Sequence, residues 1–152
     1  MMRSIPAAGH SIGYGAVVRA CLRSGKPGLP DDLLNVYPAA LPTNSGTTAL
    51  SVAMSGLMAN STARKVVLPA YTCPSVAAAA LKVGLVPVLC DMEPGWIRMD
   101  KDHLRTLVDE DTLAVVAVHL FGVAEDLEAV RTLTSGCGAA VVEDATQATA
   151  NR

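Results

Sequence analysis

Short apolar runs alternate with amphipathic stretches along the chain from Lys65 onward. Each run is brief and is bounded by glycine, proline or charged residues, which is typical of strands. The four runs are Lys65–Pro69, Leu85–Asp91, Leu113–Leu120 and Ala139–Asp144. Strands that are apolar throughout belong to parallel sheets, because helices cover both faces of such sheets. The pattern therefore predicts four strands of one mostly parallel sheet.

The stretches between these runs have the apolar spacing of helices. They are Cys73–Gly84, Asp100–Glu110 and Ala124–Gly136. In the first, Pro74 suits the opening turn and Gly84 suits the C-terminal cap. In the second, Leu104, Leu107 and Val108 share one helical face. Strands joined by helices predict the α/β class, with helices on both faces of the sheet.

The first part of the chain has a different pattern. We expect a short helix at Tyr14–Arg23, a turn rich in glycine and proline at Gly25–Pro30, and a longer helix that opens at Ser45–Thr47. The expected domain division is a helical segment over residues 1–40, followed by the strand–helix region over residues 41–152.

Composition narrows the function classes. The 152 residues are 51% apolar and 17% charged, a balance that suits a sheet buried on both faces. A net charge of −2 and 3% aromatic residues give no basis for binding nucleic acid or an anionic membrane. The longest apolar run, Leu113–Ala124, is too short to span a bilayer, and the N-terminus lacks the unbroken apolar stretch of a signal peptide. We therefore expect a cytoplasmic protein.

The cysteines and histidines show no metal-binding spacing. The four cysteines form no CxxC pair, and the three histidines are scattered along the chain. Free cytoplasmic thiols are therefore expected rather than a disulfide framework or a zinc site.

The stretch NSGTTALSVAM, Asn44–Met54, is the first candidate for chemistry. Asn44 or Ser45 can cap the helix, Gly46 lets a ligand approach the backbone, and Thr47 adds a hydroxyl. The free N–H groups and positive dipole end of a helix bind phosphate groups. An ordinary capped helix is the alternative reading of the same residues.

The second candidate is the acidic end of the last predicted strand. Glu143 and Asp144 stand where ligands bind in α/β proteins, and Gln147 follows closely. They could equally be solvated acids that begin a loop. His119 ends an apolar strand and is read as a core residue with satisfied hydrogen bonds. The segment Tyr71–Cys73 also follows a strand end, where it could line a ligand site or cap a helix.

The order of these motifs is more specific than any one of them. The chain from Leu41 to Ala148 closely resembles the large domain of the DegT/DnrJ/StrS family of pyridoxal-phosphate sugar aminotransferases, which are fold type I enzymes. The motifs that carry the resemblance are the helix start at Asn44, then PAYTCPSVAAAALKVGLVPVLCDME, VHLFG and VVEDATQA. The resemblance implies a partial pyridoxal-phosphate-binding large domain over residues 41–152.

The resemblance also implies a role for each site residue. Gly46 and Thr47 match the turn that holds the cofactor phosphate, and Asp144 matches the acid that pairs with the pyridinium nitrogen. Gln147 matches a residue near the ring hydroxyl. Cys73 stands where the family has an aromatic side chain stacked on the ring, a departure that nearby Tyr71 could offset.

The implied activity is transfer of an amino group from an amino acid donor to a keto-sugar nucleotide, by a homodimer. In this family the lysine that binds the cofactor covalently lies beyond the Glu-Asp stretch, and Lys26, Lys65, Lys82 and Lys101 match no such motif. The family's small C-terminal domain is also absent. We therefore expect no catalytic residue in this chain and no activity from it alone.

Two other functions stay open at this point. One is a non-catalytic remnant that keeps the sheet but performs no chemistry. The other is a generic doubly wound nucleotide-binding domain, although the sequence contains neither GxGxxG nor a phosphate-binding Walker loop.

Overall fold

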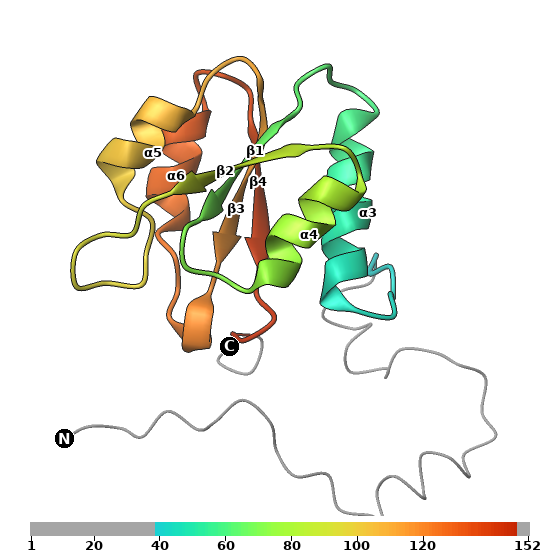
Figure 1. Cartoon of the computed structure of the whole chain (residues 1–152), viewed down its shortest axis with the longest axis horizontal. Coiled ribbons are helices and arrows are strands. Elements are labelled where there is room, and N and C mark those ends of the chain that lie inside the picture. Colours follow the sequence, from blue (N-terminus) through green and yellow to red (C-terminus); the bar gives the residue numbers. More distant parts are fainter. Residues whose placement is uncertain (1–38, 149–152) are drawn as a thin grey trace, which may run out of the picture. The chain divides into compact units, whose positions relative to one another are not determined.

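The computed structural model of the chain describes residues 39–148 (Figure 1). The chain divides into two units, Met1–Pro42 and Thr43–Arg152, and every described helix and strand belongs to the second. The helix predicted at Tyr14–Arg23 and the turn predicted at Gly25–Pro30 lie outside the described residues.

Four parallel strands form one sheet. They are β1 (Lys65–Pro69), β2 (Val86–Cys90), β3 (Thr112–Val118) and β4 (Ala140–Asp144). Their order across the sheet is β2-β1-β3-β4, and every pairing is parallel. Each strand coincides with one of the four apolar runs, so the predicted parallel sheet and α/β class are confirmed.

Helices cover both faces of the sheet. Figure 1 shows α3 (Gly46–Met58) and α4 (Pro74–Lys82) on one side, and α5 (Lys101–Leu107) and α6 (Leu127–Thr134) on the other. Alternate residues of each strand point to opposite faces, so Leu68 packs in the core beneath α3 and α4, whereas neighbouring Val67 packs beneath α5 and α6. Both side chains are fully buried.

The termini of α3 and α4 follow the sequence signals. Ser45 caps α3, since its Oγ accepts a hydrogen bond of 3.2 Å from the Thr48 N–H. Pro74 opens α4, where its missing N–H costs nothing. Gly84 follows the end of α4 with a φ of +81°, a left-handed conformation that glycine adopts without strain.

Helices α5 and α6 are shorter than their predicted ranges, Asp100–Glu110 and Ala124–Gly136. Helix α5 stops at Leu107, because Val108 turns to an extended ψ of 128°. The Asp109 carboxylate then accepts hydrogen bonds from the Asp111 N–H and the Thr112 hydroxyl, which forms a tight turn into β3. The apolar run at 113–120 likewise leaves the strand early, and Leu120–Gly122 forms a 3₁₀ turn, η1.

The connections between the strands predict a crevice at the carboxyl ends of β1 and β3. From β1 the chain moves outward to β2, and from β3 it moves in the opposite direction to β4. In such sheets ligands bind beyond the carboxyl ends of the strands at this reversal. Within residues 39–148, no helix is long and apolar enough to cross a membrane.

Candidate functional site

A cavity of about 230 Å³ lies at the carboxyl edge of the sheet. The start of α3, the start of α4, the ends of β3 and β4, and the loop after β4 all contribute to its wall. The lining residues are Gly46, Thr47, Leu50, Thr72, Cys73, Ser75, Val118, His119, Leu120, Asp144, Thr146 and Gln147. All five residues to which the family resemblance gives a cofactor-binding role, Gly46, Thr47, Cys73, Asp144 and Gln147, therefore converge on one concavity.

The start of α3 supplies hydrogen-bond donors to this cavity. The first N–H groups of a helix have no partner within it, and they point toward its N-terminus. Ser45 Oγ accepts from the Thr48 N–H, so the N–H groups of Gly46 and Thr47 lie before that capped position. A Cβ on Gly46 would lie 3.7 Å from Thr146 Oγ1, across the loop that follows β4. The helix start thus presents donors and an open backbone to an anion.

Asp144 supplies a negative charge to the same cavity. It is the last residue of β4, and its backbone carbonyl accepts a hydrogen bond of 3.0 Å from the His119 N–H. Its carboxylate accepts from the Thr146 N–H at 3.2 Å and from the Thr146 hydroxyl at 2.5 Å. A donor-rich helix start and a fixed carboxylate therefore face the same space, linked through Thr146.

The loop between β1 and α4 forms a third wall. Cys73 precedes α4, and its Sγ accepts a hydrogen bond of 3.0 Å from Ser75 Oγ. Thr72 Oγ1 is buried and has no hydrogen-bond partner among residues 39–148. Tyr71, the alternative stacking residue, is 57% exposed and does not line the cavity. Of these two residues, Cys73 lines the cavity and Tyr71 does not.

The thiols differ in environment, which gives a first prediction. The hydrogen bonds from Ser75 lower the pKa of the exposed Cys73 thiol, whereas burial raises the pKa of Cys90 to about 12. Iodoacetamide reacts with thiolates, so at pH 7.5 Cys73 should be alkylated well before Cys90 in the folded chain. Peptide mapping by mass spectrometry measures the order, and Ser75→Ala should slow Cys73 while leaving Cys90 unchanged. Equal rates for Cys73 and Cys90 would contradict the structure.

Gln147 lines the cavity but its carbonyl is already engaged. Its Oε1 accepts a hydrogen bond of 2.5 Å from the Phe121 N–H. Phe121 has a φ of 54°, a left-handed conformation that costs a non-glycine residue about 1 kcal/mol. Gln147 therefore holds the strained turn after β3 against the loop after β4, in addition to facing the cavity.

His119 has the satisfied hydrogen bonds expected of a core histidine. It is 5% exposed, its Nδ1 accepts a hydrogen bond of 3.0 Å from the Glu125 N–H, and its Nε2 lies 2.8 Å from Glu143 Oε1. Because Nδ1 accepts a hydrogen bond, Nε2 carries the ring hydrogen and donates a hydrogen bond to Glu143. His119 thus forms part of the cavity floor in a fixed orientation.

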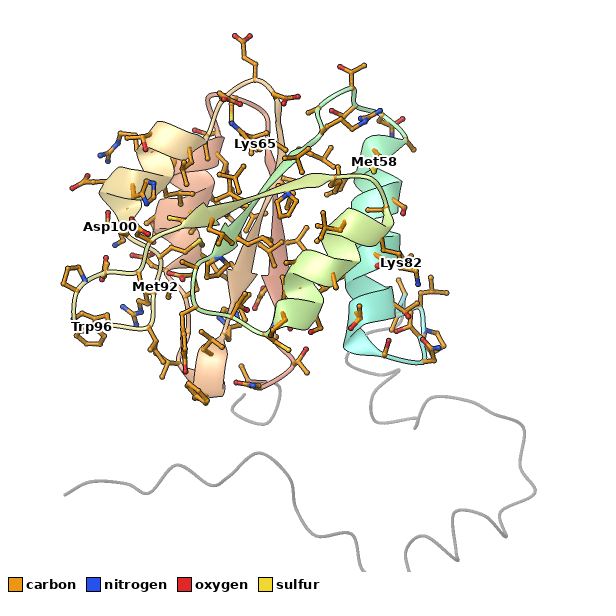
Figure 2. All side chains as sticks on the ribbon, viewed as in Figure 1. Met58, Lys65, Lys82, Met92, Trp96 and Asp100 are labelled. Atoms are coloured by element: carbon orange, nitrogen blue, oxygen red, sulfur yellow. The ribbon has the colours of Figure 1, made fainter. Side chains whose placement is uncertain are left out.

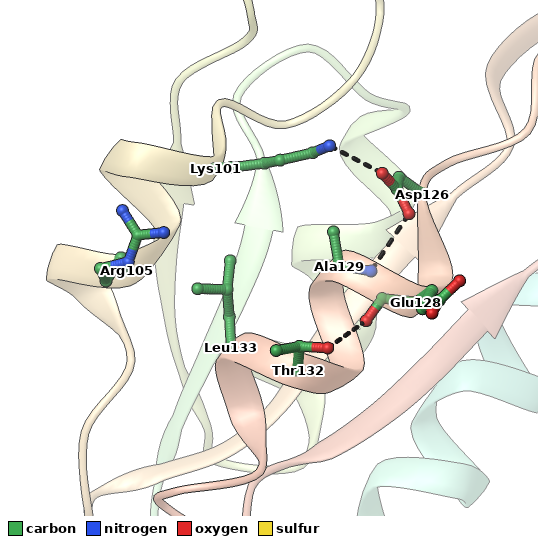
Figure 3. Close-up of a pocket in the computed structure, with 7 residues that line it drawn as sticks. All are labelled: Lys101, Arg105, Asp126, Glu128, Ala129, Thr132 and Leu133. Atoms are coloured by element: carbon green, nitrogen blue, oxygen red, sulfur yellow. Dashed lines mark hydrogen bonds and ion pairs between the residues drawn. The ribbon is translucent and has the colours of Figure 1, made fainter.

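A larger cavity, of about 350 Å³, lies between α5 and α6 (Figure 3). Three of its four charged lining residues are in ion pairs. Lys101 Nζ lies 2.7 Å from Asp126 Oδ2, and this contact raises the pKa of Lys101 and lowers that of Asp126. Arg105 pairs with Asp102 at 2.6 Å. This groove lies away from the carboxyl edge and none of the candidate residues lines it, so the smaller cavity is the candidate site.

Two polar residues of the site were missed from sequence: Ser75 and Thr146. Ser75 lies two residues after Cys73 at a strand-to-helix junction, a position that could have signalled it, whereas Thr72 belongs to the segment Tyr71–Cys73 that the sequence already offered as a possible ligand wall. Thr146 follows Asp144 by two residues, the spacing at which a side-chain carboxylate accepts from a backbone N–H. Among residues 39–148, no group of three histidine, cysteine or acidic side chains is placed to hold a metal ion.

Comparison with known proteins finds similar sequences and similar solved structures. The chain is 32% identical over 110 residues to an L-glutamine:2-deoxy-scyllo-inosose aminotransferase of Streptomyces paromomycinus, a match that covers 71% of the chain and 25% of that protein. Among solved structures, DesV of S. venezuelae in complex with a ketimine intermediate matches with a TM-score of 0.64 and 30% identity, covering 69% of the chain and 28% of DesV. The structure of 3-amino-5-hydroxybenzoic acid synthase matches with a TM-score of 0.62 and 28% identity, covering 68% and 27%.

These matches cover most of the chain but only part of each relative. The chain spans about a quarter of the length of the curated relatives it matches. The model of the DegT/DnrJ/EryC1/StrS aminotransferase family matches residues 35–152, which include every residue of the cavity. The chain therefore belongs to the DegT/DnrJ/EryC1/StrS aminotransferase family.

Proposed function

We propose that this chain forms the cofactor-binding part of a pyridoxal-phosphate-dependent aminotransferase that acts on keto-sugar nucleotides. The observation that carries the proposal is the convergence of Gly46, Thr47, Cys73, Asp144 and Gln147 on one cavity. Family membership favours this function over a generic nucleotide-binding domain. A helix start with N–H donors and a carboxylate line the same cavity, and they suit the phosphate and the ring nitrogen of a phosphorylated pyridine.

The residues present fit this cofactor. The backbone of Gly46 and Thr47 would hold the phosphate, and the absence of a Cβ at Gly46 keeps the approach to the helix start open. The buried Thr72 hydroxyl would gain a hydrogen-bond partner in a ligand, because it has none among the described residues. Asp144 would receive the ring nitrogen.

When bound, pyridoxal phosphate would supply an electron-accepting ring for chemistry at the substrate's α-carbon. Asp144 serves that chemistry by keeping a proton on the ring nitrogen, since a nearby carboxylate favours the protonated form. Its own orientation is set by the Thr146 N–H and hydroxyl. Gln147 supports the site from the loop that carries Thr146, through its bond to Phe121.

The finer parts of the proposal are an amino acid donor, a keto-sugar nucleotide acceptor, a homodimer and a cytoplasmic location. The family resemblance supports them, and the relative from Streptomyces paromomycinus has L-glutamine as donor in its name. We also propose the division into an N-terminal segment over residues 1–40 and a partial cofactor-binding domain over residues 41–152.

The described lysines lie away from the cavity. Lys65 begins β1, at the amino ends of the strands, and pairs there with Asp109. Lys82 is the last residue of α4, at the far end of that helix from the site (Figure 2). Lys101 lies in the groove between α5 and α6. None of these three side chains is placed to bond a cofactor held at Asp144.

We therefore expect no specific covalent attachment of the cofactor at Lys65, Lys82 or Lys101. Incubation with pyridoxal phosphate, reduction with borohydride and mass spectrometry should give only scattered, substoichiometric pyridoxyl-lysine, and the mixture should show no amino transfer. A single stoichiometric adduct, together with amino transfer that disappears in Asp144→Asn, would show that a lysine of this chain acts as the catalytic base.

The proposed phosphate contact is tested by Gly46→Ala. The added Cβ meets Thr146 Oγ1 at an ordinary contact distance of 3.7 Å, so the fold should be kept, but the methyl group occupies the approach to the helix start. Binding should weaken by roughly tenfold, the effect of a modest steric conflict. The probe is pyridoxine 5′-phosphate, which lacks the aldehyde and cannot react with lysines, and its affinity is measured by NMR titration.

Gly56→Ala is the matched control, since it lies in the same helix and a Cβ there meets nothing within 4 Å. It should bind the probe as the unmodified chain does. Equal affinity of the Gly46→Ala variant and the control would remove the phosphate assignment from the start of α3.

A further inference from the structure

We propose that Thr146 is a positioning residue for Asp144: its hydroxyl fixes the carboxylate so that one oxygen is presented to the pyridine nitrogen of the cofactor. The inference rests on the proposed function and extends it to Thr146, to which the family resemblance gives no role. Thr146 lies in the loop after β4, and its hydroxyl joins the two walls that the cofactor would bridge.

The contacts of Thr146 carry this inference. Its Oγ1 donates to Asp144 Oδ1 at 2.5 Å, and its N–H donates to the same oxygen at 3.2 Å. The same Oγ1 lies 3.7 Å from the position of a Cβ on Gly46. One hydroxyl thus contacts the acid on one wall of the cavity and borders the helix start on the other.

The hydrogen bonds to the carboxylate are one-sided. Within residues 39–148, both donors to the Asp144 side chain engage Oδ1, which leaves Oδ2 available for a ligand donor. The last torsion of an aspartate is broad, so an unrestrained carboxylate rotates freely. The backbone N–H alone forms a common turn after the strand, whereas the hydroxyl adds a second donor on a stiff, β-branched side chain. Together they orient the carboxylate before the cofactor binds.

The experiment measures how strongly the site prefers a ring nitrogen. The full chain is titrated by NMR with pyridoxine 5′-phosphate and with its 1-deaza analogue, in which carbon replaces the ring nitrogen. The ratio of the two affinities isolates the contact with Asp144, because the phosphate and the other ring groups are the same in both probes. A purely structural role of Thr146 would weaken both probes equally and leave this ratio unchanged.

Thr146→Val keeps the shape of the side chain and removes the hydroxyl, so the ratio should fall by roughly 3- to 10-fold, the effect of one lost hydrogen bond. Thr146→Ala should give the same fall and serves as the second variant should valine disturb the loop. Thr146→Ser retains the donor and should keep most of the preference.

The outcomes separate this inference from the proposed function. If Asp144→Asn abolishes the preference and Thr146→Val keeps it, the proposed function stands and the role of Thr146 is wrong. If serine lowers the ratio as much as valine does, the methyl group rather than the hydroxyl matters, and the inference is again wrong. If the unmodified chain shows no preference for the ring nitrogen, both the inference and the proposed function fail.

Discussion

Replacing Asp144 by asparagine is expected to weaken binding of pyridoxine 5′-phosphate by roughly 10- to 100-fold, the range for a lost hydrogen bond between charged groups. The substitution keeps the size of the side chain and removes its charge. A neutral amide no longer favours a proton on the ring nitrogen, and its NH₂ group repels that proton. The α3 donors for the phosphate are unchanged, so the affinity for the 1-deaza analogue should change little.

The matched control for this variant is Asp102→Asn. Asp102 lies in α5, away from the cavity, and its exposed carboxylate pairs with Arg105 at 2.6 Å. The Asp102→Asn substitution changes the net charge of the chain as Asp144→Asn does. It therefore reports how far overall charge alone affects the affinity for a phosphorylated ligand. Equal affinities of the Asp144→Asn and Asp102→Asn variants would mean that Asp144 does not contact the ring.

The largest effect on stability is expected from Leu68→Ala. Leu68 lies in the central strand β1, is fully buried, and packs against the side chains of α3 and α4. Truncation leaves a cavity that the surrounding helices and strands can fill only in part, so the free energy of unfolding should fall by about 2–5 kcal/mol. Urea denaturation followed by circular dichroism measures the change as a lower midpoint with an unchanged slope.

The control for this prediction is in the next strand. Leu89 of β2 pairs in register with Leu68, so the two side chains lie on the same face of the sheet, but Leu89 is 55% exposed at the sheet edge. Leu89→Ala removes the same atoms and should cost about 1 kcal/mol or less, because little buried surface is lost. A similar cost at both positions would contradict the strand order, which places β1 inside and β2 at the edge.

The sheet could be predicted from the sequence because its signal is local. Each strand is a short apolar run, and burial on both faces leaves the run uninterrupted. Helix ends were less predictable, because α5 ends where the Asp109 carboxylate forms a turn with Thr112 rather than where the apolar spacing stops. Such side-chain turns compete with the helix over one or two residues, and periodicity does not report them.

The placement of the candidate residues was predictable where the ends of helices and strands define it. Gly46 and Asp144 stand at a helix start and a strand end, positions that the strand–helix alternation already defines. The bond from the Thr146 hydroxyl to Asp144 is local, but the approach of Thr146 to Gly46 depends on tertiary structure. The burial of the Thr72 hydroxyl without a partner among the described residues depends on tertiary structure as well. The bond from the Phe121 N–H to Gln147 depends on a left-handed turn that no residue-type preference indicates.

The most direct test of the central claim is an NMR map of the binding site. The ¹⁵N-labelled chain is titrated with pyridoxine 5′-phosphate, and the backbone amide shifts are followed residue by residue. The cavity at the carboxyl edge predicts that the perturbed amides cluster at Gly46, Thr47, Cys73, Asp144 and Thr146. Perturbations clustered instead along the groove between α5 and α6 shown in Figure 3, or no perturbation at any residue, would contradict the proposal.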